Sequence, residues 1–145
     1  MAWTNTVSSI ANPDVRAKFE TYPPAMQTKL LRLRRLIVES AREHGVLGTL
    51  QETLKWNEPS YLAKGGSAVR FDYKPAMPDR YALYFQCQTK LIATFREVHR
   101  DAFEFEGNRA IVLKRSAKVL VRPLKHCIGL ALRYHSIKHL PLLGA

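Results

Sequence analysis

The feature that most constrains the fold is a change in the spacing of apolar residues near position 50. Before it, apolar residues recur at three- and four-residue steps from Met26 to Ala41, the spacing of one face of an α-helix. After it, apolar residues alternate with polar ones, which is typical of half-buried strands. Because the two patterns occupy separate runs of the chain, they predict the α+β class.

Other signals place further helices around these runs. Asn12 followed by Pro13 predicts a short helix up to about Tyr22, since an Asn cap and a first-turn proline both favour a helix start. Gly45 can adopt the left-handed conformation that closes the helix beginning at Pro24. Helical spacing returns over residues 91–98 and again after Pro123, where the apolar stripe is Leu124, Ile128, Ala131 and His135.

The strands expected from alternation cover residues 50–56, 61–63, 69–73, 81–87 and 103–113. Gly65-Gly66 predicts a turn before the third of them, residues 74–79 join the next two, and Gly107-Asn108 predicts a final hairpin. The expected architecture is an antiparallel meander packed against the N-terminal and C-terminal helices, which form a single layer. One domain spans residues 1–145.

Composition restricts the class of protein further. With 145 residues and 46% apolar side chains, the chain can bury a core without disulfides or metals. Its two cysteines, Cys87 and Cys127, form no CxxC pair, which suits a reducing cytoplasm. The chain has neither the pattern of a secretory signal nor an apolar run near the roughly 20 residues that cross a bilayer. We expect a cytoplasmic protein that does not enter a membrane.

The net charge of +11 is concentrated at one end of the chain. Residues 107–145 contain eight Lys and Arg and no acidic residue. Such a surface attracts nucleic acid or another polyanion, although a solvated face that maintains solubility is the commoner explanation. The candidate nucleic-acid contacts are Arg109, Lys114, Arg115, Lys118, Arg122 and Lys125.

Candidate ligand-binding residues come from the first four predicted strands. Glu52 shares one face of the 50–56 strand with apolar residues, so its carboxylate must be paired, for example with a helix arginine, or protonated and available as a ligand anchor. Trp56, Tyr61 and Tyr84 could line a concave site, although core packing is the commoner role for Trp56. Arg70, on the polar parity of its strand, could receive an anionic group.

Signals for catalysis and metal binding are weak. His135 and His139 are one helical turn apart, but a satisfied core histidine is the commoner explanation. Glu97, Asp101, Glu104 and Glu106 are the acidic cluster of the chain, and alternation places the last two on an exposed face. No phosphate-binding loop, dinucleotide fingerprint or GxSxG elbow occurs. We therefore expect no catalytic residue, metal site or cofactor, and an enzyme is the less favoured reading.

The order of these motifs resembles the YdhG-like family of bacterial domains of unknown function (domain of unknown function 1801). The resemblance covers residues 25–135 and is strongest over residues 52–61. It is carried by Leu33-Arg34-Arg35-Leu36-Ile37, Glu52, Lys55-Trp56, Pro59-Ser60-Tyr61, Gly65-Gly66 and the strands through Phe71 and Phe85. It implies a small cytoplasmic α+β domain with a sheet packed on helices. One branch of the family is described as frataxin-like iron chaperones, a role that requires an acidic surface, whereas this chain is basic.

These observations support three hypotheses. The first is a binding domain for a small ligand or a protein partner, with a cleft near Trp56 and Tyr61. The second is association with nucleic acid or another polyanion through the basic C-terminal quarter. The third, disfavoured by charge, is iron handling. A homodimer is compatible with all three.

Overall fold

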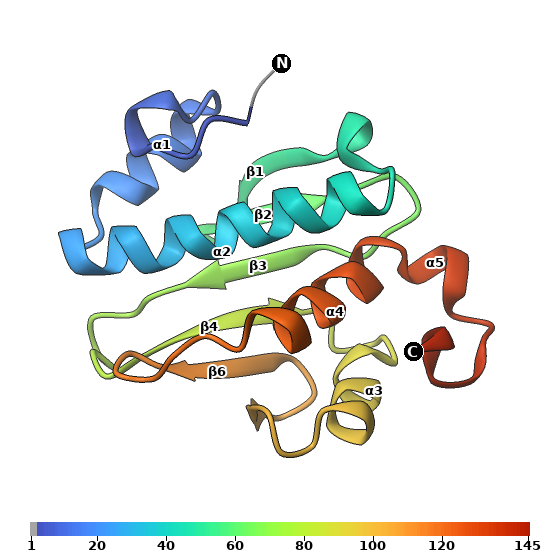
Figure 1. Cartoon of the computed structure of the whole chain (residues 1–145). Coiled ribbons are helices and arrows are strands. Elements are labelled where there is room, and N and C mark those ends of the chain that lie inside the picture. The colour runs from blue at the N-terminus through green and yellow to red at the C-terminus, as the bar shows by residue number, and fades with distance from the viewer. Residues whose placement is uncertain (1–2) are drawn as a thin grey trace.

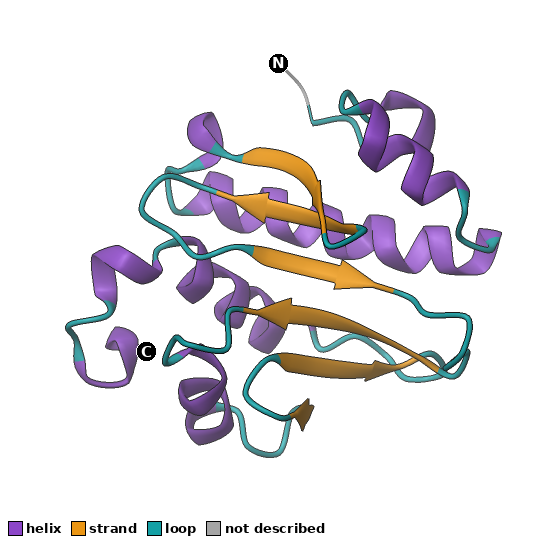
Figure 2. Cartoon of the chain, turned by 180° about the vertical axis from the view of Figure 1, so that it is seen from behind, coloured by secondary structure: helices purple, strands orange, loops and turns teal. Residues whose placement is uncertain are grey.

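The computed structural model describes residues 3–145 as a six-stranded antiparallel sheet with helices packed on one face. Figure 1 shows α2 and α4 lying across that face, and Figure 2 shows the opposite face with no helix of the described chain across it. The expected α+β class and single layer of helices are therefore confirmed. In chain order the elements are η1 (Val7–Ser9), α1 (Pro13–Glu20), α2 (Pro24–Glu43), η2 (Leu47–Thr49), β1 (Gln51–Lys55), β2 (Glu58–Leu62), β3 (Val69–Asp72), β4 (Arg80–Phe85), α3 (Leu91–Val98), β5 (Glu104–Glu106), β6 (Ala110–Lys114), α4 (Val121–Leu132), α5 (Tyr134–Ile137) and η3 (Pro141–Gly144).

The strand order is β1-β2-β3-β4-β6-β5. The first four strands form the expected meander, but β6 pairs with β4 and so places β5 at the edge of the sheet. Residues directly opposite each other in an antiparallel pair point to the same face. Val69 and Phe85 therefore face the helices, whereas Ser60, Arg70 and Tyr84 lie in one row on the other face, which we call the open face.

The start of α1 and the end of α2 follow local signals in the sequence. The Asn12 side chain accepts hydrogen bonds from the backbone N–H groups of Asp14 and Val15, at 2.9 and 3.1 Å, and so caps α1. Gly45 closes α2 with a φ of +71°, as expected. The apolar stripe of α2 is buried from Met26 to Ala41.

The C-terminal helix is shorter than its apolar stripe suggests. α4 ends at Leu132, and His135 is exposed in the short α5, so the prediction that His135 extends the buried stripe is wrong. The Gly65-Gly66 turn packs against this end of the helix. The backbone N–H of Ser67 donates to the carbonyl of Ala131 at 2.8 Å, and that of His135 donates to the carbonyl of Gly65 at 2.9 Å. These bonds to the turn satisfy groups that would otherwise continue the helix.

The core lies between the sheet and the helix layer, with Phe71 of β3 near its centre. The Phe71 ring stacks on Tyr61 at a centroid distance of 5.5 Å and meets the edge of Phe19 of α1 at 5.9 Å. Aromatic rings in this arrangement stabilise a core beyond the area that they bury. None of the helices within residues 3–145 has the length and apolar character of a membrane span.

Candidate functional site

Trp56 lies in a tight turn rather than on a strand. β1 and β2 are joined by Trp56 and Asn57, whose φ angles are +53° and +62°. Two positive φ angles are typical of a type I′ hairpin turn, which prefers Asn-Gly because bulky side chains are strained there. Trp56 is 85% exposed, so the expectation that it packs in the core is wrong. The structure therefore holds a large exposed indole in a strained backbone conformation.

Beside this turn is a recess of about 300 Å³ at one end of the open face. Trp56 forms part of its rim. Two arginines contribute to its wall: Arg70 of β3 and Arg109, which directly precedes β6. We call it the Trp56 recess. Its lining residues are Trp56, Glu58, Arg70, Phe85, Gln86, Cys87 and Arg109.

Tyr84 lies on the open face between two cations. The Nζ atom of Lys74 is 5.4 Å from the centre of the Tyr84 ring, and the guanidinium carbon of Arg109 is 5.3 Å from it. Both distances are within the range of cation–π attraction. Burial raises the pKa of Tyr84, although the neighbouring Lys74 and Arg109 charges act in the opposite direction. The strand pattern placed Tyr84 on the face opposite the main apolar residues of its strand, and the register confirms this. Tyr84 positions Arg109 rather than lining the recess itself.

Two carboxylates of the open face, those of Glu58 and Asp72, are buried and paired. Glu58 accepts hydrogen bonds from Arg70 at 3.1 Å and from Lys74 at 3.3 Å. Asp72 accepts from Lys74 at 3.2 Å and from the Tyr22 hydroxyl at 2.6 Å. Both carboxylates are therefore neutralised by neighbours, whereas Arg109 forms no ion pair with the residues described here. The recess keeps a positive charge.

The sequence pattern missed Glu58 as a member of the Trp56 recess, and it missed Asp72 and Lys74 as the paired groups beside it. Glu58 and Asp72 fall on the polar parity of their strands, as Arg70 does, so alternation alone indicates one shared face. Their proximity depends on the strand order, which no local pattern in the chain specifies.

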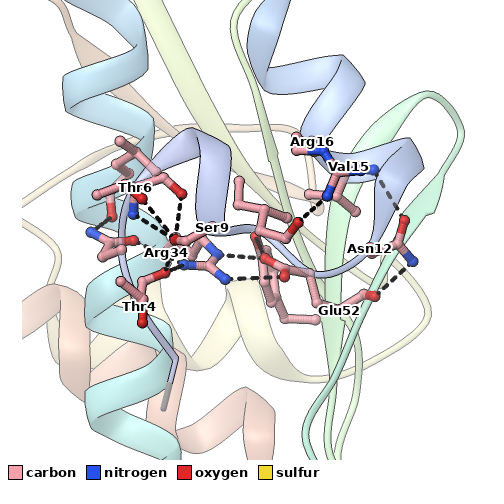
Figure 3. A network of polar contacts seen from close by, with 12 residues as sticks. Thr4, Thr6, Ser9, Asn12, Val15, Arg16, Arg34 and Glu52 are labelled. Atoms are coloured by element: carbon pink, nitrogen blue, oxygen red, sulfur yellow. Dashed lines mark hydrogen bonds and ion pairs between the residues drawn. The ribbon is translucent and has the colours of Figure 1, made fainter. Parts of the chain in front are cut away.

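Glu52 and Tyr61 lie on the helix side of the sheet, away from Arg70 and Tyr84. The Arg34 side chain of α2 binds both Glu52 oxygens (Figure 3), with Nε–Oε2 and Nη2–Oε1 distances of 2.5 and 3.1 Å. The Tyr61 hydroxyl donates to Glu52 Oε2 at 2.7 Å. Pairing of Glu52 with a helix arginine, one of the two alternatives drawn from the sequence, is confirmed. Tyr61 is fully buried, so the expectation that it lines a cleft beside Trp56 is wrong.

This buried network is electrostatically self-consistent. Burial works against the Arg34 charge, but its hydrogen bonds and charge interaction with Glu52 outweigh that effect and raise the Arg34 pKa. Burial and the Glu52 carboxylate raise the Tyr61 pKa well above its ordinary value. The guanidinium also donates to the carbonyl of Thr4 at 2.9 Å and to the side chain of Asn5 at 3.1 Å, which holds the N-terminal segment against α2.

The basic residues of the C-terminal quarter are spread over several surfaces. Arg109 belongs to the Trp56 recess, and Lys125 of α4 pairs with Glu39 and Glu43 of α2 at 3.6 and 2.6 Å. Arg122 is exposed near the start of α4. Lys114, Arg115 and Lys118 follow one another at the end of β6 and in the next loop, where the two lysines are exposed and Arg115 is partly buried.

The acidic cluster does not converge. Glu97 pairs with Arg100 at 3.4 Å, Glu106 pairs with Arg80 at 3.2 Å, and the His99 ring bonds to His126 at 2.8 Å. Across residues 3–145, no group of three or more His, Cys, Asp and Glu side chains could hold a metal ion. The iron-handling hypothesis therefore gains no support from this geometry.

Neither a scan of protein-family models nor a search of curated proteins gave a match to this chain. Among solved structures, the chain is similar to YdhG from Bacillus subtilis, a protein of the DUF1801 family. The TM-score is 0.59 and 15% of residues are identical, over 81% of this chain and 87% of that chain. At this level of identity the similarity concerns the fold. The resemblance to YdhG-like domains inferred from the sequence is thus confirmed for the fold.

Proposed function

We propose that this protein is a non-enzymatic binding domain, and that the Trp56 recess takes a small anionic ligand with a planar group. The planar group would stack on the Trp56 indole and the anionic group would pair with Arg109. This places the cleft expected from the sequence on the open face, with Trp56 and Arg70 as members and Glu52 and Tyr61 outside it.

The observation that carries the proposal is the exposure of Trp56 in a strained turn. A non-glycine residue in the left-handed region costs about 1–3 kcal/mol, and such strain clusters at functional sites. Burying an indole stabilises a protein strongly, yet 85% of this side chain is left in solvent. A bound planar group would cover the exposed ring and supply the missing burial.

The charge distribution supports an anionic ligand. Arg70 is shared with the buried Glu58, whereas Arg109 is held over Tyr84 and pairs with no carboxylate of the described chain. Stacking on Tyr84 orders the guanidinium without neutralising it, so Arg109 is prepared to bind a carboxylate or phosphate. The two carboxylates nearby are held by cations, which argues against a role for them as general acid or base.

Native mass spectrometry of gently purified protein is the first test, since it also reports the number of subunits. A retained small molecule should be lost from Trp56→Ala and Arg109→Ala but kept by Arg42→Ala, which removes an exposed arginine of α2 on the helix side. The second test is a titration with adenosine 5′-monophosphate as a planar anionic probe. Saturable quenching of tryptophan fluorescence should be lost in Trp56→Phe. The proposal would be contradicted if the protein retained no small molecule and adenosine 5′-monophosphate caused no saturable quenching.

A second candidate function is polyanion association through Lys114, Arg115 and Lys118. Three basic residues within five positions, in a quarter of the chain with no acid, support it. Binding to a single-stranded oligonucleotide should weaken steeply with salt and weaken further in Lys114→Gln/Lys118→Gln. Lys125→Gln is the matched control, because Lys125 is already engaged by Glu39 and Glu43. Binding that is insensitive to salt would remove this candidate.

A further inference from the structure

A second recess of about 440 Å³ lies between the N-terminal segment, α2 and β1. Its apolar walls include Trp3, Ala11 and Leu50, and the paired Arg34 and Glu52 side chains lie among its lining groups. We call it the Arg34 recess. Glu52 is on the helix face of the sheet, so this recess and the Trp56 recess are on different sides of the molecule. The volume is within the usual range for small-molecule sites.

The polar groups of the Arg34 recess have hydrogen-bonding capacity left over. A guanidinium has five N–H donors. Nε donates to Glu52, Nη1 donates to Thr4 and to Asn5, and Nη2 donates to Glu52. Within residues 3–145 one Nη2 proton therefore has no acceptor. Oε1 of Glu52 accepts one bond, whereas Oε2 accepts two, from Arg34 and Tyr61.

The spare donor and the spare acceptor are adjacent. They belong to Nη2 of Arg34 and Oε1 of Glu52, which are 3.1 Å apart in one hydrogen bond. The two side chains are only 3% and 6% exposed, so an unmet donor or acceptor here has limited access to water. A ligand that carries an acceptor beside a donor would satisfy both groups together.

We propose that the Arg34 recess binds a small, neutral molecule with an apolar ring and a primary carboxamide or similar amide group. The amide oxygen accepts from Arg34 Nη2, and the amide N–H donates to Glu52 Oε1. A free carboxylate has no N–H to donate to Glu52 Oε1, and an ammonium has no acceptor for Arg34 Nη2, so the ion pair selects a neutral group with both functions. The ring packs against Trp3 and Leu50. This inference does not depend on the function proposed for the Trp56 recess.

Benzamide is a suitable probe, and heteronuclear NMR of the full chain a suitable readout. The chain has two tryptophans, so its two indole N–H resonances report the two recesses separately. Benzamide should shift the Trp3 indole and Arg34 Nε resonances in a saturable way and leave the Trp56 indole unchanged. Acetophenone, which has the acceptor but no donor, should bind about tenfold more weakly or less, and so should benzoate.

The test variant changes an exposed position at the edge of the recess, because variants of the buried ion pair risk unfolding. Ala11 is exposed and lines the recess, so Ala11→Trp adds bulk there and should weaken benzamide binding about tenfold or more. Ala76→Trp, exposed in the loop between β3 and β4, should bind like the wild type. Equal binding of benzamide and acetophenone, no saturable shift at Trp3, or unchanged binding by Ala11→Trp would overturn the proposal.

Discussion

The guanidinium carbon of Arg109 lies 5.3 Å from the centre of the Tyr84 ring. Arg109 comes from the turn before β6 and Tyr84 from β4, so this contact exists only because those strands pair. It holds an exposed arginine at the wall of the Trp56 recess and gives the recess its unpaired positive charge.

Arg109 and Tyr84 should therefore be energetically coupled. In a double-mutant cycle with Arg109→Ala and Tyr84→Leu, we expect a coupling free energy of about 0.5–1 kcal/mol, the range for an exposed cation–π pair. Urea unfolding of the four proteins measures it. Arg96→Ala with Tyr84→Leu is the control cycle, because Arg96 stacks on Phe105 instead. Strict additivity for Arg109 would contradict the contact.

Trp56→Asn should stabilise the protein relative to Trp56→Ala. Both variants remove the exposed indole, but Asn tolerates the left-handed conformation that the turn requires, whereas Ala does not. The expected difference is about 0.5–1 kcal/mol in the free energy of unfolding, measured with urea. If Trp56→Asn and Trp56→Ala are equally stable, the turn is not strained. Both should lose the ligand of the Trp56 recess.

Removing one member of the Arg34–Glu52 pair should be far more damaging than removing both. Arg34→Met leaves a buried carboxylate without its main partner and should cost about 3–5 kcal/mol. The double variant Arg34→Met/Glu52→Met replaces the pair with apolar side chains and should recover part of that loss. Thermal or urea unfolding of single and double variants decides the matter, and a double variant as unstable as the sum of the single variants would contradict the pairing.

Gly66→Ala should destabilise the protein although the residue is small and lies in a turn. A methyl group at Gly66 would come within 2.3 Å of the backbone oxygen of Leu132, so the turn or the end of α4 must move. We expect a loss of about 1–3 kcal/mol in urea unfolding. Gly48→Ala is the matched control, because a methyl group there meets no atom within 4 Å and should change stability by less than about 1 kcal/mol.

Stability should fall as the pH decreases through the range below 6.5. Burial lowers the pKa of His99 and His126, and the nearby Arg133 lowers that of His126 further. When the folded pKa is below the unfolded value, the unfolded chain binds protons first, so acid favours unfolding. Well above pH 6.5 both states are neutral at these rings and the full stability is present. The slope of unfolding free energy against pH should be smaller in His99→Gln/His126→Gln, and an unchanged slope would contradict this account.

Much of the fold could be predicted because its signals are local. The cap at Asn12, the stripe along α2, the alternation along β3 and β4 and the Gly65-Gly66 turn each act over a few residues. The extent of α4 could not be predicted, since its end is decided by backbone bonds to a turn about 65 residues earlier in the chain. The sequence pattern also placed Trp56 at the end of the first strand, whereas β1 ends one residue earlier, at Lys55. An alternating pattern does not mark where a strand stops and a turn begins.

For the candidate sites, the sequence by itself determined which residues could carry charge, stack or pair, and on which parity of its strand each one lies. It also determined the α+β class, because apolar spacing reflects local backbone geometry. Only the tertiary structure decided which residues of different strands lie together on one face of the sheet. Strand order and register place Arg70 and Tyr84 with Arg109 on the open face, and they place Glu52 and Tyr61 against Arg34 of α2. These are long-range contacts, and their free energy depends on packing across the whole sheet rather than on any segment of the chain.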